Sequence, residues 1–146
     1  MKNKRFKEKI EKYLKRQFGV TIDSASKRQV YEALMSTIRE DLSEKKFAYE
    51  QELKKTRQKR AYYMSMEFLV GRTLRNNLFN LDLEKDVREY FADNGISLDE
   101  IYDIEPDPGL GNGGLGRLAS CYLDALTSSD YPVTGFSILY EYGIFK

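Results

Sequence analysis

Apolar residues recur at helical spacing through the first third of the chain. They mark two faces, Phe6, Ile10, Leu14 and Phe18 on the first and Val30, Leu34, Ile38 and Leu42 on the second. Spacings of three and four residues predict two amphipathic helices. The first helix should end before Gly19. The second should begin after Ser26, which forms a capping-box pattern with Gln29, and should continue to about residue 56 because no Pro or Gly interrupts it.

The pattern changes near residue 59. Residues 61–66 are aromatic and apolar, which predicts a buried strand. Further helices are predicted at 72–78, at 83–93 and from Ser97. Another follows the glycines, with an apolar side formed by Leu115, Leu118, Tyr122 and Leu126. Phe136, Ile138 and Tyr140 alternate as in an extended segment. These elements predict an α/β fold that is mostly helical with a few strands, with a helical region at 1–58 and the start of an α/β core at 59–146.

Composition narrows the chemistry that the chain can perform. It has 146 residues, of which 41% are hydrophobic and 32% charged, and it contains no histidine. Catalytic triads, Cys–His dyads and histidine-based zinc sites are therefore excluded, and we expect no metal site. No apolar run approaches the ~20 residues of a membrane-spanning helix, and the Lys-rich start lacks the apolar core of a signal peptide. We expect a cytoplasmic protein without a membrane partner.

Charge is distributed unevenly along the chain. Residues 1–60 hold 18 Lys and Arg against 9 Asp and Glu, whereas residues 61–146 hold 6 against 14. A basic half can bind nucleic acid, an anion or a membrane surface, or it can be a solvated face or pack against the acidic half. No aromatic residues line the basic face, so we expect no nucleic-acid partner. The alternative is a small non-catalytic binding module that uses the basic helix at 1–18.

The most informative segment is glycine-rich and runs from residue 109 to 117. It precedes a predicted helix, where backbone amides and the positive end of the helix dipole favour a negative group. Arg117 adds a positive charge to the first turn. The segment predicts a phosphate or carboxylate held near Gly113, Gly114 and Leu115. The alternative is a tight turn that only packs closely against a neighbouring segment.

Other glycine-loop interpretations fit less well. The spacing G-x-G-x-x-G is present, but residues 103–108 do not form the strand that a dinucleotide site requires before the loop. A Walker A loop needs Lys and Ser or Thr after its last glycine, and Arg117 and Leu118 stand there. Glu67 follows the predicted strand at 61–66, where a carboxylate often faces a cleft; the alternative is an ion pair with Arg72 or Arg75.

Three segments together resemble one family. Residues 60–74 read RAYYMSMEFLVGRTL, residues 105–119 read EPDPGLGNGGLGRLA, and residues 140–145 read YEYGIF. They are similar to the α-glucan phosphorylases, the glycogen, starch and maltodextrin enzymes. The resemblance implies two Rossmann-like domains of GT-B type, with residues 1–146 as the beginning of the first domain. It also implies a usually homodimeric enzyme that transfers a terminal glucosyl unit from an α-1,4-glucan to inorganic phosphate, giving glucose 1-phosphate.

The resemblance also implies roles for individual residues. Gly113, Gly114 and Leu115 match the loop whose amides contact the substrate phosphate and the glucosyl unit. Glu67 matches a glutamate that lines the same pocket, and Asn112 matches a flanking polar residue directed at the sugar, with Asp107 as a second flanking polar position. The family cofactor is pyridoxal phosphate, whose attachment lysine has no counterpart in these 146 residues. We therefore expect the isolated chain to be inactive.

Overall fold

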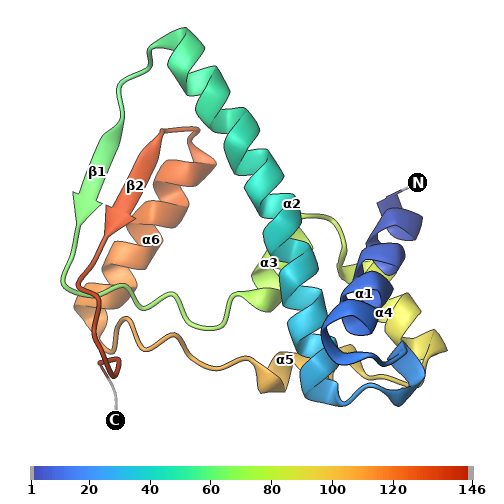
Figure 1. Ribbon diagram of the computed structural model, residues 1–146. Helices are drawn as coiled ribbons and strands as arrows, with labels where there is room; N and C mark the ends of the chain where they lie inside the picture. Colours follow the sequence, from blue (N-terminus) through green and yellow to red (C-terminus); the bar gives the residue numbers. More distant parts are fainter. Residues whose placement is uncertain (1, 145–146) are drawn as a thin grey trace. The chain divides into compact units, whose positions relative to one another are not determined.

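The computed structural model describes residues 2–144, with side chains from residue 5 onward. Its elements are α1 (Lys2–Phe18), the 3₁₀ turn η1 (Ile22–Ser24), α2 (Lys27–Thr56), β1 (Ala61–Met64), α3 (Leu74–Asn80), α4 (Glu84–Asp93), α5 (Leu98–Ile104), α6 (Gly114–Ser128) and β2 (Val133–Phe136) (Figure 1). The prediction of a mostly helical chain with a few strands is confirmed.

The chain forms two compact units that interleave along the sequence. The first holds Met1–Ala48 and Thr73–Pro106, and the second holds Tyr49–Arg72 and Asp107–Lys146. Helix α2 therefore contributes to both units. The predicted boundary at residue 58 concerns the domain layout of the family and stays a prediction.

The first unit is built on the two predicted amphipathic helices. Side chains from both faces share one core, with Phe6, Ile10 and Leu14 of α1 and Val30, Leu34 and Ile38 of α2 all buried. The capping box is present, because Ser26 N–H donates to Gln29 Oε1 at 2.8 Å and Gln29 N–H donates to Ser26 Oγ at 3.3 Å. Leu42, the last residue of the predicted face, lies one turn beyond the last buried position and is exposed.

Glu105 organises the rest of the first unit. Its carboxylate is buried and accepts hydrogen bonds from the backbone N–H groups of Thr73 and Leu74, at 2.8 to 3.1 Å, and from the Thr73 hydroxyl at 3.1 Å. A helix start leaves its first N–H groups without intrahelical acceptors, and Glu105 supplies acceptors to the start of α3. The end of α5 is thereby tied to the beginning of α3.

The second unit is a two-stranded parallel sheet with α6 against one face (Figure 1). The register pairs Ala61 with Val133 and Met64 with Phe136. The prediction that residues 61–66 are buried is wrong, because Tyr62 is 63% exposed and Met64 is 80% exposed. In this unit the helix covers one face of the sheet, so alternate side chains of β1 point away from it.

Helix α6 packs through small residues. Gly116, Ala119 and Ser120 are its buried positions. The predicted apolar side is not buried: Leu115, Leu118 and Tyr122 are each about half exposed. A Cβ at Gly116 would lie 3.0 Å from the Leu69 nitrogen, so α6 approaches the segment after β1 closely at this glycine, whereas the side chain of Leu123 lies against Gly135 of β2.

Candidate functional site

The glycine loop is anchored to the segment that follows β1. Phe68 N–H donates to the carbonyl of Leu110 at 2.7 Å, and Leu69 N–H donates to the carbonyl of Gly116 at 2.9 Å. The approach is so close that a Cβ at Gly111 would lie 2.5 Å from the Leu69 nitrogen. Only glycine fits at that position, because any side chain would collide with the backbone of Phe68 and Leu69.

Glu67 is joined to the loop by its carboxylate. Oε2 accepts a hydrogen bond from Asn112 N–H at 2.8 Å, and Oε1 accepts one from Gly116 N–H at 3.0 Å. The Glu67 side chain thus connects Asn112 with Gly116, which lies in the first turn of α6. A carboxylate at a helix N-terminus is stabilised by the dipole and by charge-assisted bonds. The loop therefore already contains one negative group, supplied by its own unit.

Three amides of the loop remain open. Within residues 2–144, the backbone N–H groups of Gly113, Gly114 and Leu115 have no hydrogen-bond acceptor. Gly113 is the N-cap of α6 and carries no side-chain cap. Unpaired N–H groups at the start of a helix are the groups that bind anions in proteins. Among the loop amides, those of the three residues predicted to hold an anion thus remain available.

An open hollow of about 380 Å³ lies beside the loop. Its lining residues are Met66, Glu67, Leu115, Tyr140, Gly143 and Ile144. The Tyr140 hydroxyl and the Ser137 hydroxyl both donate to the Met66 carbonyl, at 2.9 and 3.1 Å. Ile144 N–H donates to the Gly109 carbonyl at 2.8 Å. The segment after β2 therefore forms one wall of the hollow.

Sequence reasoning missed the part played by Ser137 and Tyr140. Both lie in or next to the alternating residues 136–140, which were predicted to be extended, and neither residue type by itself signals a bond to a backbone carbonyl 71 or 74 residues earlier. Asp107 has a local role, because its Oδ1 accepts from Gly109 N–H at 2.8 Å and closes a turn. Asn112 is exposed. The direction of its side chain toward a sugar stays a prediction.

The arrangement combines donors and an acceptor in a small space. Open amides suit phosphoryl or carboxylate oxygens, whereas the Glu67 carboxylate suits a group that carries a hydroxyl.

The dinucleotide-site interpretation requires a strand before the glycine loop, but the element that precedes residues 105–113 is helix α5. None of the helices described in residues 2–144 has the length and apolar character that a membrane crossing requires.

Comparisons with a family model and with known proteins indicate the same family. A sequence model described as carbohydrate phosphorylase matches residues 91–146. The glycogen phosphorylase of Chlamydia trachomatis is 42% identical over 125 residues, covering 86% of this chain and 15% of the relative. That of Synechocystis is 45% identical over 121 residues, covering 83% of this chain and 14% of the relative.

The chain belongs to the carbohydrate phosphorylase family, a family of glycosyltransferases. Its similarity extends to animal members, since the liver form of human glycogen phosphorylase is 43% identical over 122 residues, or 84% of this chain. The chain spans only about 14 to 15% of the length of these relatives. The resemblance seen in the three sequence segments is therefore confirmed at the level of the family.

Proposed function

We propose that this chain supplies the glycine-loop half of the active site of an α-1,4-glucan phosphorylase. The reaction transfers a terminal glucosyl unit to inorganic phosphate and yields glucose 1-phosphate. The observation that carries the proposal is the set of open amides at Gly113, Gly114 and Leu115, next to the Glu67 carboxylate and the hollow. The amides bind phosphoryl oxygen, and Glu67 and Asn112 face hydroxyl groups of the glucosyl unit.

The remaining parts of the proposal follow from the family. The complete protein is a homodimeric, cytoplasmic enzyme of GT-B type, and residues 1–146 begin its first Rossmann-like domain. When bound, pyridoxal phosphate supplies a phosphate group that exchanges protons during the reaction, and its attachment lysine lies outside these residues. Open amide donors beside the hollow suit the oxygens of such phosphate groups. The isolated chain gives no glucose 1-phosphate.

A matched pair of substitutions at Gly114 tests the role of the amides. Gly114→Pro removes the N–H at the first position of α6, where proline is well tolerated. Gly114→Ala keeps the N–H, and a Cβ there meets no atom within 4 Å. Both variants are placed in a chimera in which this chain replaces the matching segment of the Chlamydia trachomatis glycogen phosphorylase. The alanine variant should retain the KM for phosphate, and the proline variant should raise it about tenfold, as expected for one lost hydrogen bond to a charged group.

A second readout does not depend on turnover. Titration of the 146-residue chain with inorganic phosphate, followed by NMR, should shift the amide signals of Gly113, Gly114 and Leu115. Glucose 1-phosphate production by the isolated chain from maltodextrin, phosphate and added cofactor would refute its expected inactivity. Equal phosphate affinity of the proline and alanine variants, in both experiments, would refute the amide site itself.

A further inference from the structure

The basic surplus of the first 60 residues is not used by the glycine loop. In the first unit it is concentrated along α1, where an open hollow of about 750 Å³ follows the helix. Arg5, Lys9, Lys12 and Arg16 line it. Their spacing of four, three and four residues places all of them on one side of the helix. Four of the eight cations of α1 therefore form a row along one side of the helix.

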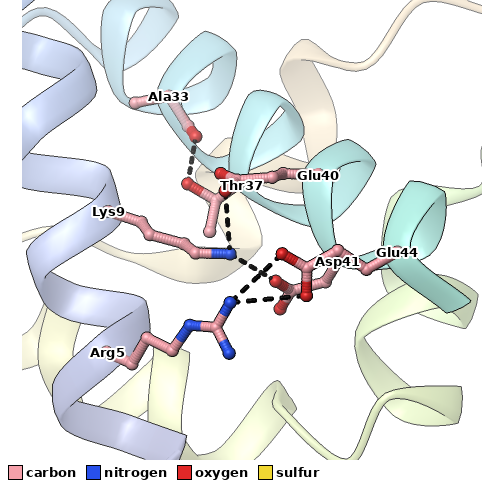
Figure 2. A network of polar contacts seen from close by, with 7 residues as sticks. All are labelled: Arg5, Lys9, Ala33, Thr37, Glu40, Asp41 and Glu44. Atoms are coloured by element: carbon pink, nitrogen blue, oxygen red, sulfur yellow. Dashed lines mark hydrogen bonds and ion pairs between the residues drawn. The ribbon is translucent and has the colours of Figure 1, made fainter.

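Two of these cations are already neutralised by α2, as Figure 2 shows. Arg5 Nη2 lies 3.2 Å from Glu44 Oε1. Lys9 Nζ lies 2.6 Å from Asp41 Oδ1 and 3.3 Å from Glu40 Oε1. Burial opposes the charge of the Lys9 ammonium, but the bonds and charges of Asp41 and Glu40 outweigh burial and raise the pKa of Lys9. These two positions hold α1 against α2.

The other two cations have no such partner. Lys12 and Arg16 are exposed, and neither forms an ion pair with any residue whose side chain the structure describes. They are four residues apart, which is a rise of about 6 Å along the helix. Tyr13 and Gln17 line the same hollow and bring a hydroxyl and an amide to it. This end of the hollow therefore has two cations that form no ion pair among the described side chains, together with neutral hydrogen-bonding groups, and Glu8 lies one turn before Lys12.

The remaining lining residues limit which ligand fits. Glu8 and Glu40 are the acidic members, and Glu40 is paired with Lys9. A single small anion at a solvated lysine or arginine gains little, because water screens the attraction. An anion that contacts Lys12 and Arg16 at the same time is attracted by both charges. A linear anion with several charged oxygens matches the linear arrangement of the cations along α1. We propose that this hollow is a binding site for a short linear polyphosphate anion, with Lys12 and Arg16 as its charged contacts.

Charge reversal on one helix tests the site with a matched control. Lys12→Glu and Arg16→Glu change two cations that line the hollow, whereas Lys15→Glu makes the same change at an exposed residue of α1 outside the lining. Calorimetric titration of the full chain with tripolyphosphate should show at least tenfold weaker binding for the first two variants. The control should stay within about threefold of the parent, since charges outside the site are screened by salt. Circular dichroism verifies that the helices persist.

Three results would overturn the proposal. The first is the absence of tripolyphosphate binding by the parent chain. The second is equal weakening by all three substitutions, which would indicate attraction by net charge alone. The third is tighter binding of a short oligothymidylate of equal charge through Lys12 and Arg16, which would make the surface a nucleic-acid site. The loss of tripolyphosphate affinity caused by Lys12→Glu and Arg16→Glu should be the same with and without Gly114→Pro, which separates this site from the glycine loop.

Discussion

The bond between Glu67 and the glycine loop leads to a quantitative prediction. Glu67→Ala removes the acceptor of two amides, those of Asn112 and Gly116. A hydrogen bond to a charged group contributes about 1.5–3 kcal/mol when it is sheltered and less when water can replace the partner. Asn112 is exposed and Gly116 is buried. The first bond should therefore contribute about 1 kcal/mol and the second about 2 kcal/mol, so the variant should lose about 3 kcal/mol of stability.

Glu67→Gln separates charge from shape. Its carbonyl oxygen can still accept one hydrogen bond, but its NH₂ group faces the second amide N–H, which is also a donor. We expect a loss of about 1–2 kcal/mol, between the parent and the alanine variant. Asp124→Asn is the control, because it neutralises an exposed carboxylate on the same helix, α6, and should change stability by less than about 0.5 kcal/mol.

Urea unfolding followed by circular dichroism measures these losses, and amide hydrogen exchange locates them. Exchange at Gly116 and Asn112 should accelerate in both Glu67 variants, because exchange requires the protecting bond to open. The reasoning is refuted if Glu67→Ala unfolds at the same urea concentration as Asp124→Asn and leaves Gly116 exchange unchanged. The loop would then be held by its backbone bonds alone.

Three further predictions concern other positions. Gly111→Ala should lower stability by more than about 3 kcal/mol, because its Cβ would lie 2.5 Å from a backbone nitrogen. Gly114→Ala should change stability by less than about 1 kcal/mol, because its Cβ would meet no atom within 4 Å. Similar melting temperatures for the two variants would contradict the close approach at Gly111. Glu105→Ala should cost about 3–5 kcal/mol by leaving buried N–H groups unpaired, and unchanged hydrogen exchange at Leu74 would count against this. Burial and the charge of Glu84 raise the pKa of Tyr102 to about 12 in the folded protein. Between about pH 10 and pH 12 the folded phenol therefore keeps its proton while the unfolded one loses it. The free energy of unfolding should fall as the pH rises through this interval. Tyr102→Phe should lose less stability than the parent over that interval in urea unfolding, and an equal loss would refute the assignment.

Sequence reasoning was most successful where the determinants are local. The spacing of Phe6, Ile10 and Leu14 located α1 and its buried face, and Ser26 with Gln29 located the start of α2. These features depend on residues three or four positions apart, so periodicity and cap chemistry describe them completely. The glycine loop could be recognised for the same reason, because its glycines are contiguous and precede a helix.

The burial of the second unit could not be predicted in this way. Residues 61–66 were predicted to form a buried strand, because aromatic and apolar side chains are usually buried, and the large apolar residues of α6 were predicted to share one side of the helix. Tyr62, Met64 and Leu115 are exposed, since α6 covers one face of the sheet and its buried positions are Gly116, Ala119 and Ser120. Which face of a strand or helix is covered depends on the segments that pack there, and periodicity within the element does not specify them.

The sequence by itself determined the helices and the family resemblance, and it predicted an anion site at the glycine loop. Only the tertiary structure decided that Glu67 bonds to amides 45 and 49 residues away and that the amides of Gly113, Gly114 and Leu115 are left open. The physical reason is the distance along the chain over which each interaction acts. Helix propensity and capping act within about one turn, whereas a carboxylate's partners are selected when distant segments pack and bury the groups between them.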